Sequence, residues 1–503
     1  MAKNVFNTVQ VAKSPQNWFD LGHDVKMTLE MGKLIPFLCQ EVLPGDYWKL
    51  SSQTLIRFAP LVAPVMHSIN VSMHYFFVPN RLVWDQWEDF ISPPKVDSLP
   101  PAHPYFDLTS AAFYAKGTLT DYFGMPTGKP LTGVNALPFF AYQKIYNEYY
   151  RDQNLMDEVT DKAVSGGNVV GTAYSVRTRS WMHDYFTASL PFAQKGAPVS
   201  LPIVAANDVP VVRAAPGAPA AVWSNTSPST TNTQVNGRAS GGAYIQNYLY
   251  AQTSAINFSA TTINDLRTAI KTQEFLERQA RGGSRYIEQI KMQFGVTSSD
   301  ARLQRPEFIG GTKNPVIISE VLQTSSSDGT TPQATMAGHG ISANSGKVMS
   351  YYAEEHGFII GIMSVTPNTA YQQGLPKQFF RKDIYDYAFP IFGNIGEQAV
   401  LNKEVYYDNA DGLNNGTFGY VPRYSEYRYI PSRVAGEFRD TLAFWHLGRI
   451  FSNRPSLNSD FIRCAPRNDI FAVTQANNQN LWCHVYNSVK ARRKLPKYGT
   501  PML

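Results

Sequence analysis

Alternation of apolar and polar residues with a period of two is the feature that most constrains the fold of this chain. Residues 25–31 place Val25, Met27 and Leu29 between polar neighbours, and residues 68–77 repeat the pattern. Because successive side chains of a strand point to opposite faces, both stretches are predicted to be half-buried β-strands. Further strands are predicted from short apolar runs at 315–323, 357–365, 400–407 and 469–474.

Long stretches separate these predicted strands, and helical patterns are few. A βαβ protein alternates strands with helices, whereas an all-β sandwich or jelly roll tolerates long loops between its strands. The 503-residue chain is therefore predicted to be all-β, with long loop insertions and a few helices. The insertions divide it into residues 1–195, a surface insertion at 196–261, and residues 262–503. A proline-rich surface loop is predicted at 92–138, and a variable loop at 323–349.

The clearest helical pattern covers residues 262–281, where Thr262 and Asp265 form a capping-box pattern. Its apolar residues follow helical spacing and are predicted to pack the helix onto the protein, and Gly282 and Gly283 are predicted to end it. Shorter helices are predicted at 82–91 and 139–151. The apolar residues of the long helix are Ile263, Leu266, Ile270 and Leu276.

Three arginines, Arg278, Arg281 and Arg285, lie around the double glycine. Two of them follow a glutamate at a spacing of four residues, which favours ion pairs along the helix and neutralises the patch. The segment is therefore interpreted as a structural corner or a subunit contact, and not as a phosphate-binding site. Substituting Arg278 or Arg281 is predicted to impair assembly more than folding of the monomer.

Motifs for catalysis are absent from the sequence. Residues 338–348 resemble a phosphate-binding loop, but Ile341 stands where the motif needs Gly and Val348 where it needs Ser or Thr. The zinc-protease HExxH, nucleophile-elbow GxSxG and dinucleotide-binding GxGxxG patterns do not occur. No catalytic residue, metal ligand or cofactor is therefore predicted. A pair of distant carboxylates for glycoside hydrolysis is left open.

The three cysteines, Cys39, Cys464 and Cys483, are far apart in the sequence. This pattern predicts small buried side chains in a reducing compartment, not a disulfide framework. The first residues form no apolar signal-peptide core, and the longest apolar run, 358–363, is too short to span a membrane.

Positive charge is concentrated at the C-terminus. Residues 470–503 contain no Asp or Glu and carry +5 of the formal net charge of +6. With its prolines and a tyrosine, the tail at 485–503 is predicted to be an extended basic arm that contacts single-stranded nucleic acid. A solvated chain end is the alternative. The predicted nucleic-acid-binding residues are Lys490, Arg492, Arg493, Lys494, Lys497 and Tyr498.

Several stretches together resemble one family: WFDLGHDVKMTLEMGKLIPFLCQEVLPGDY (18–47), LPFFAYQKIYNEYYRDQNL (137–155), DLRTAIKTQEFLERQARGGSRYIEQIKMQFGV (265–296) and YQQGLPKQFFRKDIYDYAFPIFGNIGEQAV (371–400). In these stretches the chain is similar to the major capsid proteins of gokushoviruses, small single-stranded-DNA phages of the Microviridae. Further matches at 183–196, 299–311, 357–365 and 422–439 keep the same order along the chain.

The resemblance implies an eight-stranded antiparallel jelly roll with long insertions. It implies assembly of many copies into a T=1 icosahedral shell around circular single-stranded DNA, with residues 196–261 as a protrusion at the threefold axes that engages a receptor on the bacterial host surface. The implied partners are an internal scaffolding protein, a DNA pilot protein and a small basic DNA-binding protein. The implied location is the virion, assembled in the host cytoplasm.

Two other classes of protein remain open on residue patterns alone. An all-β enzyme or carbohydrate-binding module would use the 28 tyrosines and eight tryptophans as sugar platforms, and would form a small oligomer. A soluble protein that binds single-stranded DNA would bind tightly as a free subunit, with a steep salt dependence.

Overall fold

The structure is a computed structural model that describes residues 16–92, 99–197, 199, 211–213, 249–251, 263–322, 324, 336–409, 412–473 and 479–498. Two compact units are distinguished. The smaller unit is Gln194–Arg281, and the larger contains the rest of the chain. Each is described by itself.

One sheet of the larger unit has seven antiparallel strands in the order β1-β18-β4-β13-β12, with β2 also paired to β18 and β14 to β4. Its longest members, β4 and β18, pair along twelve residues, from Leu481 opposite Phe58 to Arg492 opposite Tyr47. The strands are β1 (Asn17–Asp20), β2 (His23–Leu29), β4 (Tyr47–Phe58), β12 (Ile317–Leu322), β13 (Met336–Asn344), β14 (Met349–Tyr352) and β18 (Leu481–Arg493).

The second sheet has four antiparallel strands in the order β11-β5-β15-β3. They are β3 (Ile35–Val42), β5 (Ile69–Pro79), β11 (Glu307–Pro315) and β15 (Gly357–Pro367). The main hydrophobic core lies between the two sheets. One side of it is formed by alternate residues of β4 and β18, such as Trp48, Leu50 and Val485, and the other by residues of β5 and β15 such as Met73 and Ile359.

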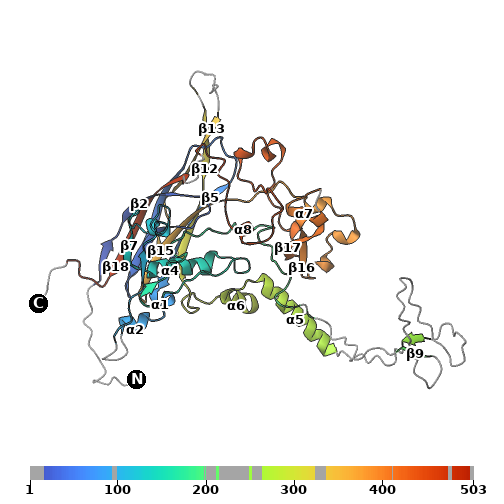
Figure 1. Cartoon of the computed structure of the whole chain (residues 1–503), viewed down its shortest axis with the longest axis horizontal. Helices are drawn as coiled ribbons and strands as arrows, with labels where there is room; N and C mark the ends of the chain where they lie inside the picture. The colour runs from blue at the N-terminus through green and yellow to red at the C-terminus, as the bar shows by residue number, and fades with distance from the viewer. Residues whose placement is uncertain are drawn as a thin grey trace, which may run out of the picture. The chain divides into compact units, whose positions relative to one another are not determined.

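The two central strands of the four-stranded sheet, β5 and β15, are buried on both faces. The second face of the sheet, with Phe76 and Ile360, packs against α4 (Leu137–Ile145), which continues as the π-helical turn η2 (Tyr146–Tyr150) (Figure 1). This explains why every residue of β15 is buried, whereas β4 alternates strictly between buried and more exposed positions. Side chains of α1 (Asn80–Val83), α2 (Trp87–Ile91), α3 (Leu119–Tyr122), β6 (Tyr105–Leu108) and β7 (Leu131–Asn135) join this second core, and β8 (Gly167–Asn168) pairs with β6.

A third, smaller core lies under β16 (Glu397–Leu401) and β17 (Thr417–Pro422) and includes Val400, Phe418 and Phe461. The other short elements here are α7 (Asn402–Val405), α8 (Ser459–Ile462) and the 3-10 turns η4 (Lys377–Phe379), η5 (Ile384–Asp386), η6 (Pro390–Phe392), η7 (Gly412–Asn415), η8 (Ser425–Tyr427), η9 (Gly436–Arg439) and η10 (Ala443–Trp445).

The all-β class is confirmed, because the described residues are mostly β-sheet with few helices. The strands predicted at 25–31, 68–77, 315–323 and 357–365 are present as β2, β5, β12 and β15. The prediction at 400–407 is wrong beyond Leu401, where α7 begins. The prediction at 469–474 is wrong as well, because Ile470 and Phe471 are buried side chains in a loop with one isolated bridge to Leu61.

Two predicted loops contain ordered elements. The proline-rich stretch 92–138 contains β6, β7 and α3, whose buried side chains belong to the second core. Within 323–349, the glycine-rich segment is strand β13 and not a loop. A side chain at Gly340 would meet the Phe58 ring, and one at Gly338 the backbone of Ala63, so these glycines allow close packing.

The helix predicted at 262–281 is present as α5 (Ile263–Arg281) and stops before the double glycine. It belongs to the smaller unit, together with β9 (Val211–Arg213) and β10 (Leu249–Ala251). The predicted packing through its apolar side chains is wrong for Ile263, Leu266 and Ile270, which are exposed. The pattern does describe an amphipathic helix, but the described residues supply no apolar partner for its first turns. Thr262 lies outside the described residues.

Candidate nucleic-acid interface

The basic C-terminal segment is extended, as predicted, but its first half is not a free arm. Lys490, Arg492 and Arg493 lie in β18, between β1 on one side and β4 on the other. Lys494, Lys497 and Tyr498 follow the strand and are exposed. The prediction of a free arm is therefore wrong up to Arg493, because this segment is a central strand of the larger sheet.

Arg493 lies on the face of β18 opposite to Lys490 and Arg492, and its side chain stabilises the fold. Its Nε lies 2.9 Å from a carboxylate oxygen of Asp46, which is only 1% exposed, and its guanidinium donates to the carbonyl oxygen of Glu41 at 2.7 Å. The same guanidinium lies 4.9 Å from the Trp48 ring centroid. The positive charge of Arg493 is thus neutralised inside the chain, and we assign it a structural role.

Arg492 belongs to an aromatic row across the outer face of the sheet, the face opposite the main core. Register pairs Arg492 with Trp18 of β1 and Tyr47 of β4, and pairs Tyr47 with Tyr352 of β14. The Arg492 guanidinium lies 6.0 Å from the Trp18 ring and 5.5 Å from the Tyr47 ring. Four neighbouring strands therefore present an unbroken row of three aromatic side chains and one cation.

Positive charge is in excess on this face. Strands β1, β2, β4 and β18 direct five cations and two carboxylates outward, an excess of three positive charges. Among the described residues none of the five forms an ion pair with a carboxylate, whereas one carboxylate, Asp24, pairs with His484 at 2.9 Å. Lys49 lies 5.4 Å from the Trp18 ring. The five cations are Lys26, Lys49, Arg57, Lys490 and Arg492.

An open pocket of about 630 Å³ lies on the same face, at the other end of β18. Lys26, Arg57 and the half-exposed Trp482 line it, with Gln479, Tyr122 and the carboxylate of Asp121 as polar groups on the wall. Aromatic rings beside unpaired cations are what single-stranded nucleic acid needs, because bases stack on rings while phosphates contact Lys and Arg. We define the row, the five cations and this pocket as the outer face.

Sequence reasoning found Lys490 and Arg492 but missed Trp18, Lys49 and Arg57. These residues come from strands more than 420 positions away in the sequence, and only strand register brings them beside β18. One usable signal was the alternation in 481–491, where Leu481, Val485 and Val489 are buried at even spacing. It would have identified a strand where charge alone indicated a tail.

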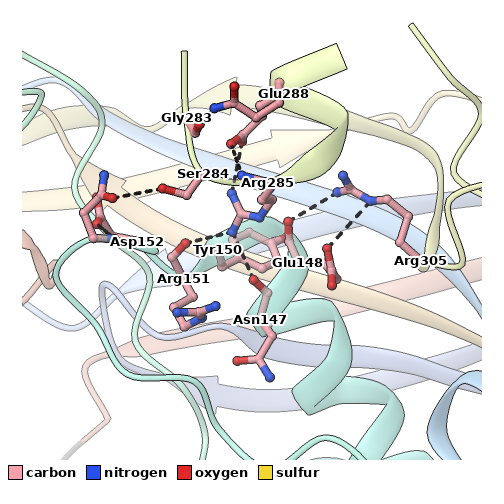
Figure 2. Close-up of polar contacts among 12 residues, drawn as sticks. Asn147, Glu148, Tyr150, Arg151, Asp152, Gly283, Ser284, Arg285, Glu288 and Arg305 are labelled. Carbon is pink, nitrogen blue, oxygen red and sulfur yellow. Dashed lines mark hydrogen bonds and ion pairs between the residues drawn. The ribbon is translucent and has the colours of Figure 1, made fainter. Parts of the chain in front are cut away.

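The predicted subunit-contact arginines occupy two different settings. Arg285 is largely buried, pairs with Glu288 at 3.2 Å, and donates to the carbonyl oxygens of Asn147 and Arg151 at 3.0 and 2.9 Å (Figure 2). It therefore satisfies carbonyl groups at the end of η2, where backbone acceptors lack helical partners. This is the structural corner that the sequence indicated, followed by α6 (Tyr286–Phe294).

Arg278 is exposed on α5 and pairs with Glu274 one helical turn earlier, as predicted. Arg281 is the last residue of the same helix. Contact of these two residues with a neighbouring subunit stays a prediction. Arg285 was predicted to contact a neighbouring subunit as well. The contacts of its side chain that are described above are all with residues of its own chain.

Signs of catalytic chemistry are few in the described ranges. No group of three or more His, Cys, Asp or Glu there could hold a metal ion, and no helix there is long and apolar enough to cross a membrane. Burial raises the pKa of the Cys464 and Cys483 thiols to about 12. Both are small buried side chains, as predicted, and are protonated at neutral pH.

Comparison with known proteins gives a consistent result. The family model described as "Capsid protein (F protein)" matches residues 7–503. Capsid protein VP1 of Chlamydia phage 1 is 35% identical, covering 100% of this chain and 98% of the relative. Capsid protein VP1 of Bdellovibrio phage phiMH2K is 34% identical over 99% of this chain, and that of Spiroplasma virus 4 is 30% identical over 97%.

The chain is therefore a structural protein of a phage virion, made in many copies, and not an enzyme. It belongs to the capsid protein (F protein) family, and its relatives are capsid proteins of gokushoviruses of the Microviridae. The resemblance seen in the sequence is confirmed, and the alternative of an all-β enzyme is excluded.

Proposed function

We propose that the two sheets form a capsid jelly roll and that the chain assembles into a T=1 icosahedral shell. Eight strands taken in chain order, β2, β3, β4, β5, β11, β13, β15 and β18, support this proposal. Numbered one to eight, they pair as 1-8-3-6 in the larger sheet and 2-7-4-5 in the smaller, which is the strand order of a jelly roll. The remaining strands, β1, β12 and β14, extend the larger sheet at its edges.

The shell encloses circular single-stranded DNA. The outer face of the seven-stranded sheet, as defined above, lines the inside of this shell and contacts the DNA. The observation that carries this proposal is the aromatic row of Trp18, Arg492, Tyr47 and Tyr352, set among cations that no carboxylate neutralises. A shell lining must bind DNA of any sequence. Stacking on rings and contact with phosphates both satisfy that condition, because every base has an aromatic face and every nucleotide a phosphate.

The test is the salt dependence of DNA binding. The triple variant Lys49→Gln, Lys490→Gln, Arg492→Gln removes three phosphate contacts. Because each contact to a single strand contributes about 0.7 to the slope of log affinity against log salt, we expect the slope to fall by about 2 and binding at about 0.15 M salt to weaken roughly 50-fold. Binding of a fluorescent oligodeoxythymidylate to the purified chain, measured by anisotropy across a salt series, gives both values.

The control variant carries Lys116→Gln, Lys129→Gln and Arg302→Gln, which remove the same charge from exposed positions elsewhere. The proposal requires its slope to stay near that of the unmodified chain. Equal losses in the two variants would mean that only net charge matters. An unchanged slope in the first variant would remove the outer face from DNA binding.

The insertion at 196–261, which is mostly outside the described residues, is proposed to form the threefold protrusion that contacts the host surface receptor. Its support is its position and its composition, with only three charged side chains. Particles lacking this segment should lose surface knobs in electron micrographs and lose adsorption to host cells. The proposed partners during assembly in the bacterial cytoplasm are the internal scaffolding protein, the DNA pilot protein and the small basic DNA-binding protein.

A further inference from the structure

An apolar surface segment follows the four-stranded sheet in the chain. Ten consecutive residues, 382–391, are all exposed, and large apolar side chains recur through and beside them. Monomeric proteins rarely leave so many large apolar groups together in water. We call these seven residues the apolar ledge: Phe379, Ile384, Tyr385, Tyr387, Phe389, Ile391 and Ile395, each between 39% and 82% exposed.

The apolar ledge is held in shape from beneath. Arg381 pairs with Glu426 at 3.0 Å, both side chains being about nine-tenths buried, and Gln398 donates to the same carboxylate at 2.6 Å. The Arg381 guanidinium also lies 4.4 Å from the Tyr427 ring. These contacts fix the backbone while the apolar side chains point outward. The ledge is therefore a preformed surface, which binds without the entropy cost of ordering a loop.

The charged side chains beside the apolar ledge indicate which class of partner this surface binds. Lys377 lies 4.0 Å from Glu426, the residue that also neutralises Arg381. The Asp386 carboxylate accepts from the backbone N–H groups of Lys382 and Asp383 at 2.8 and 2.9 Å, and so stabilises the turn η5. Apart from the exposed side chain of Lys382, the charged groups of this segment thus stabilise its own conformation. What remains is an apolar and aromatic surface without a strong field, typical of contacts between identical subunits and unlike a nucleic-acid site.

The size of the ledge is that of a stable interface. Taking about 200 Å² for each side chain, the exposed parts of the seven amount to roughly 850 Å², against about 800 Å² per partner in a standard protein interface. The family membership established above makes a second copy of this chain the partner present in the highest number. We propose that the apolar ledge is a contact between neighbouring copies of this protein in the shell.

Cross-linking in assembled particles tests the proposal. Ile391, the most exposed member of the ledge, is replaced by the photo-reactive residue p-benzoylphenylalanine, and purified particles are irradiated. We expect a product of twice the chain mass on a denaturing gel, in which mass spectrometry joins the peptide around position 391 to a second peptide of the same chain. Cross-links only within one chain, or only to another virion protein, or none, would overturn the proposal.

A charge substitution gives an independent measurement. Ile391→Asp should reduce the yield of closed shells at least tenfold while the thermal unfolding midpoint of the unassembled chain stays unchanged, because the side chain contributes little to the folded monomer. Val169→Asp is the matched control, since Val169 is 90% exposed but stands apart from the ledge in the sequence. Equal loss of shells in both variants, or normal shells from Ile391→Asp, would refute the proposal. Neither readout depends on DNA binding by the outer face.

Discussion

Two adjacent arginines of β18 should behave in opposite ways, because one points into the protein and the other points out. Arg493→Ala leaves the carboxylate of Asp46 buried without a cation, and also removes a hydrogen bond to the Glu41 carbonyl. Breaking a buried pair from one side costs about 3 to 5 kcal/mol. Arg492→Ala removes contacts between a partly exposed cation and two rings without leaving a buried carboxylate unpaired, and should cost less than about 1 kcal/mol.

These energies convert into measurable shifts. A unit of roughly 400 residues has an unfolding entropy near 0.8 kcal/mol per degree, so Arg493→Ala should lower the thermal midpoint by about 4 to 6 °C and Arg492→Ala by about 1 °C or less. Calorimetry of the unassembled chain measures both shifts. DNA binding should rank the two variants the other way. Arg492→Ala should lower the slope of log affinity against log salt by about 0.7, whereas Arg493→Ala should leave this slope unchanged.

The double variant Asp46→Asn, Arg493→Ala distinguishes the penalty of the unpaired Asp46 carboxylate from the loss of the other Arg493 contacts. If the penalty of Arg493→Ala comes from an unpaired buried charge, removing that charge should recover about half of the lost stability or more. The reasoning fails if Arg493→Ala shifts the midpoint by less than about 1 °C, or if Arg492→Ala is equally destabilising.

Two further predictions concern the larger unit. Burial and the nearby Arg179 guanidinium lower the pKa of His74 to about 4 from 6.5, so the folded chain binds fewer protons than the unfolded chain between these values, and stability should fall by about 2 kcal/mol from pH 7 to pH 5; urea midpoints measured against pH should show this slope, and His74→Gln should flatten it. Gly32→Ala should cost about 2 kcal/mol more than Gly124→Ala, because both sites have positive φ but only at Gly32 would the new Cβ meet a backbone atom, the Cys464 carbonyl oxygen at 1.9 Å; equal thermal midpoints for the two variants would contradict this explanation.

The sequence could predict strands wherever burial on one or both faces leaves a local pattern. β2 alternates in sequence and in burial, and β15 is a continuous apolar run because both of its faces are covered. β5 alternates in sequence, which predicted the strand, but the half-buried prediction is wrong because its polar-facing side is covered as well. β4 and β18 also alternate, but β18 ends in a cluster of cations that resembles a solvated terminus. The buried carboxylate of Asp46, which explains why one of those cations belongs to the fold, lies 447 positions away in the sequence.

The candidate site was predictable only in part for the same reason. Lys490 and Arg492 could be identified from charge, but their partners Trp18, Lys49 and Tyr47 are set by register between strands far apart in sequence. The apolar side chains along one face of α5 show a different limit of prediction from sequence. Their spacing correctly predicted a helix, but spacing cannot specify which surface covers them.

The position of β18 sets the order of events during synthesis of the chain. This strand is synthesised more than 420 residues after β1, β2 and β4, yet it separates β1 and β2 from β4 in the sheet. At about 5 to 20 residues per second, the early strands wait roughly 20 to 90 seconds for their central partner. The larger sheet therefore closes only after β18 has been synthesised, so a product truncated before Leu481 lacks the strand that joins its two halves and cannot present the finished outer face.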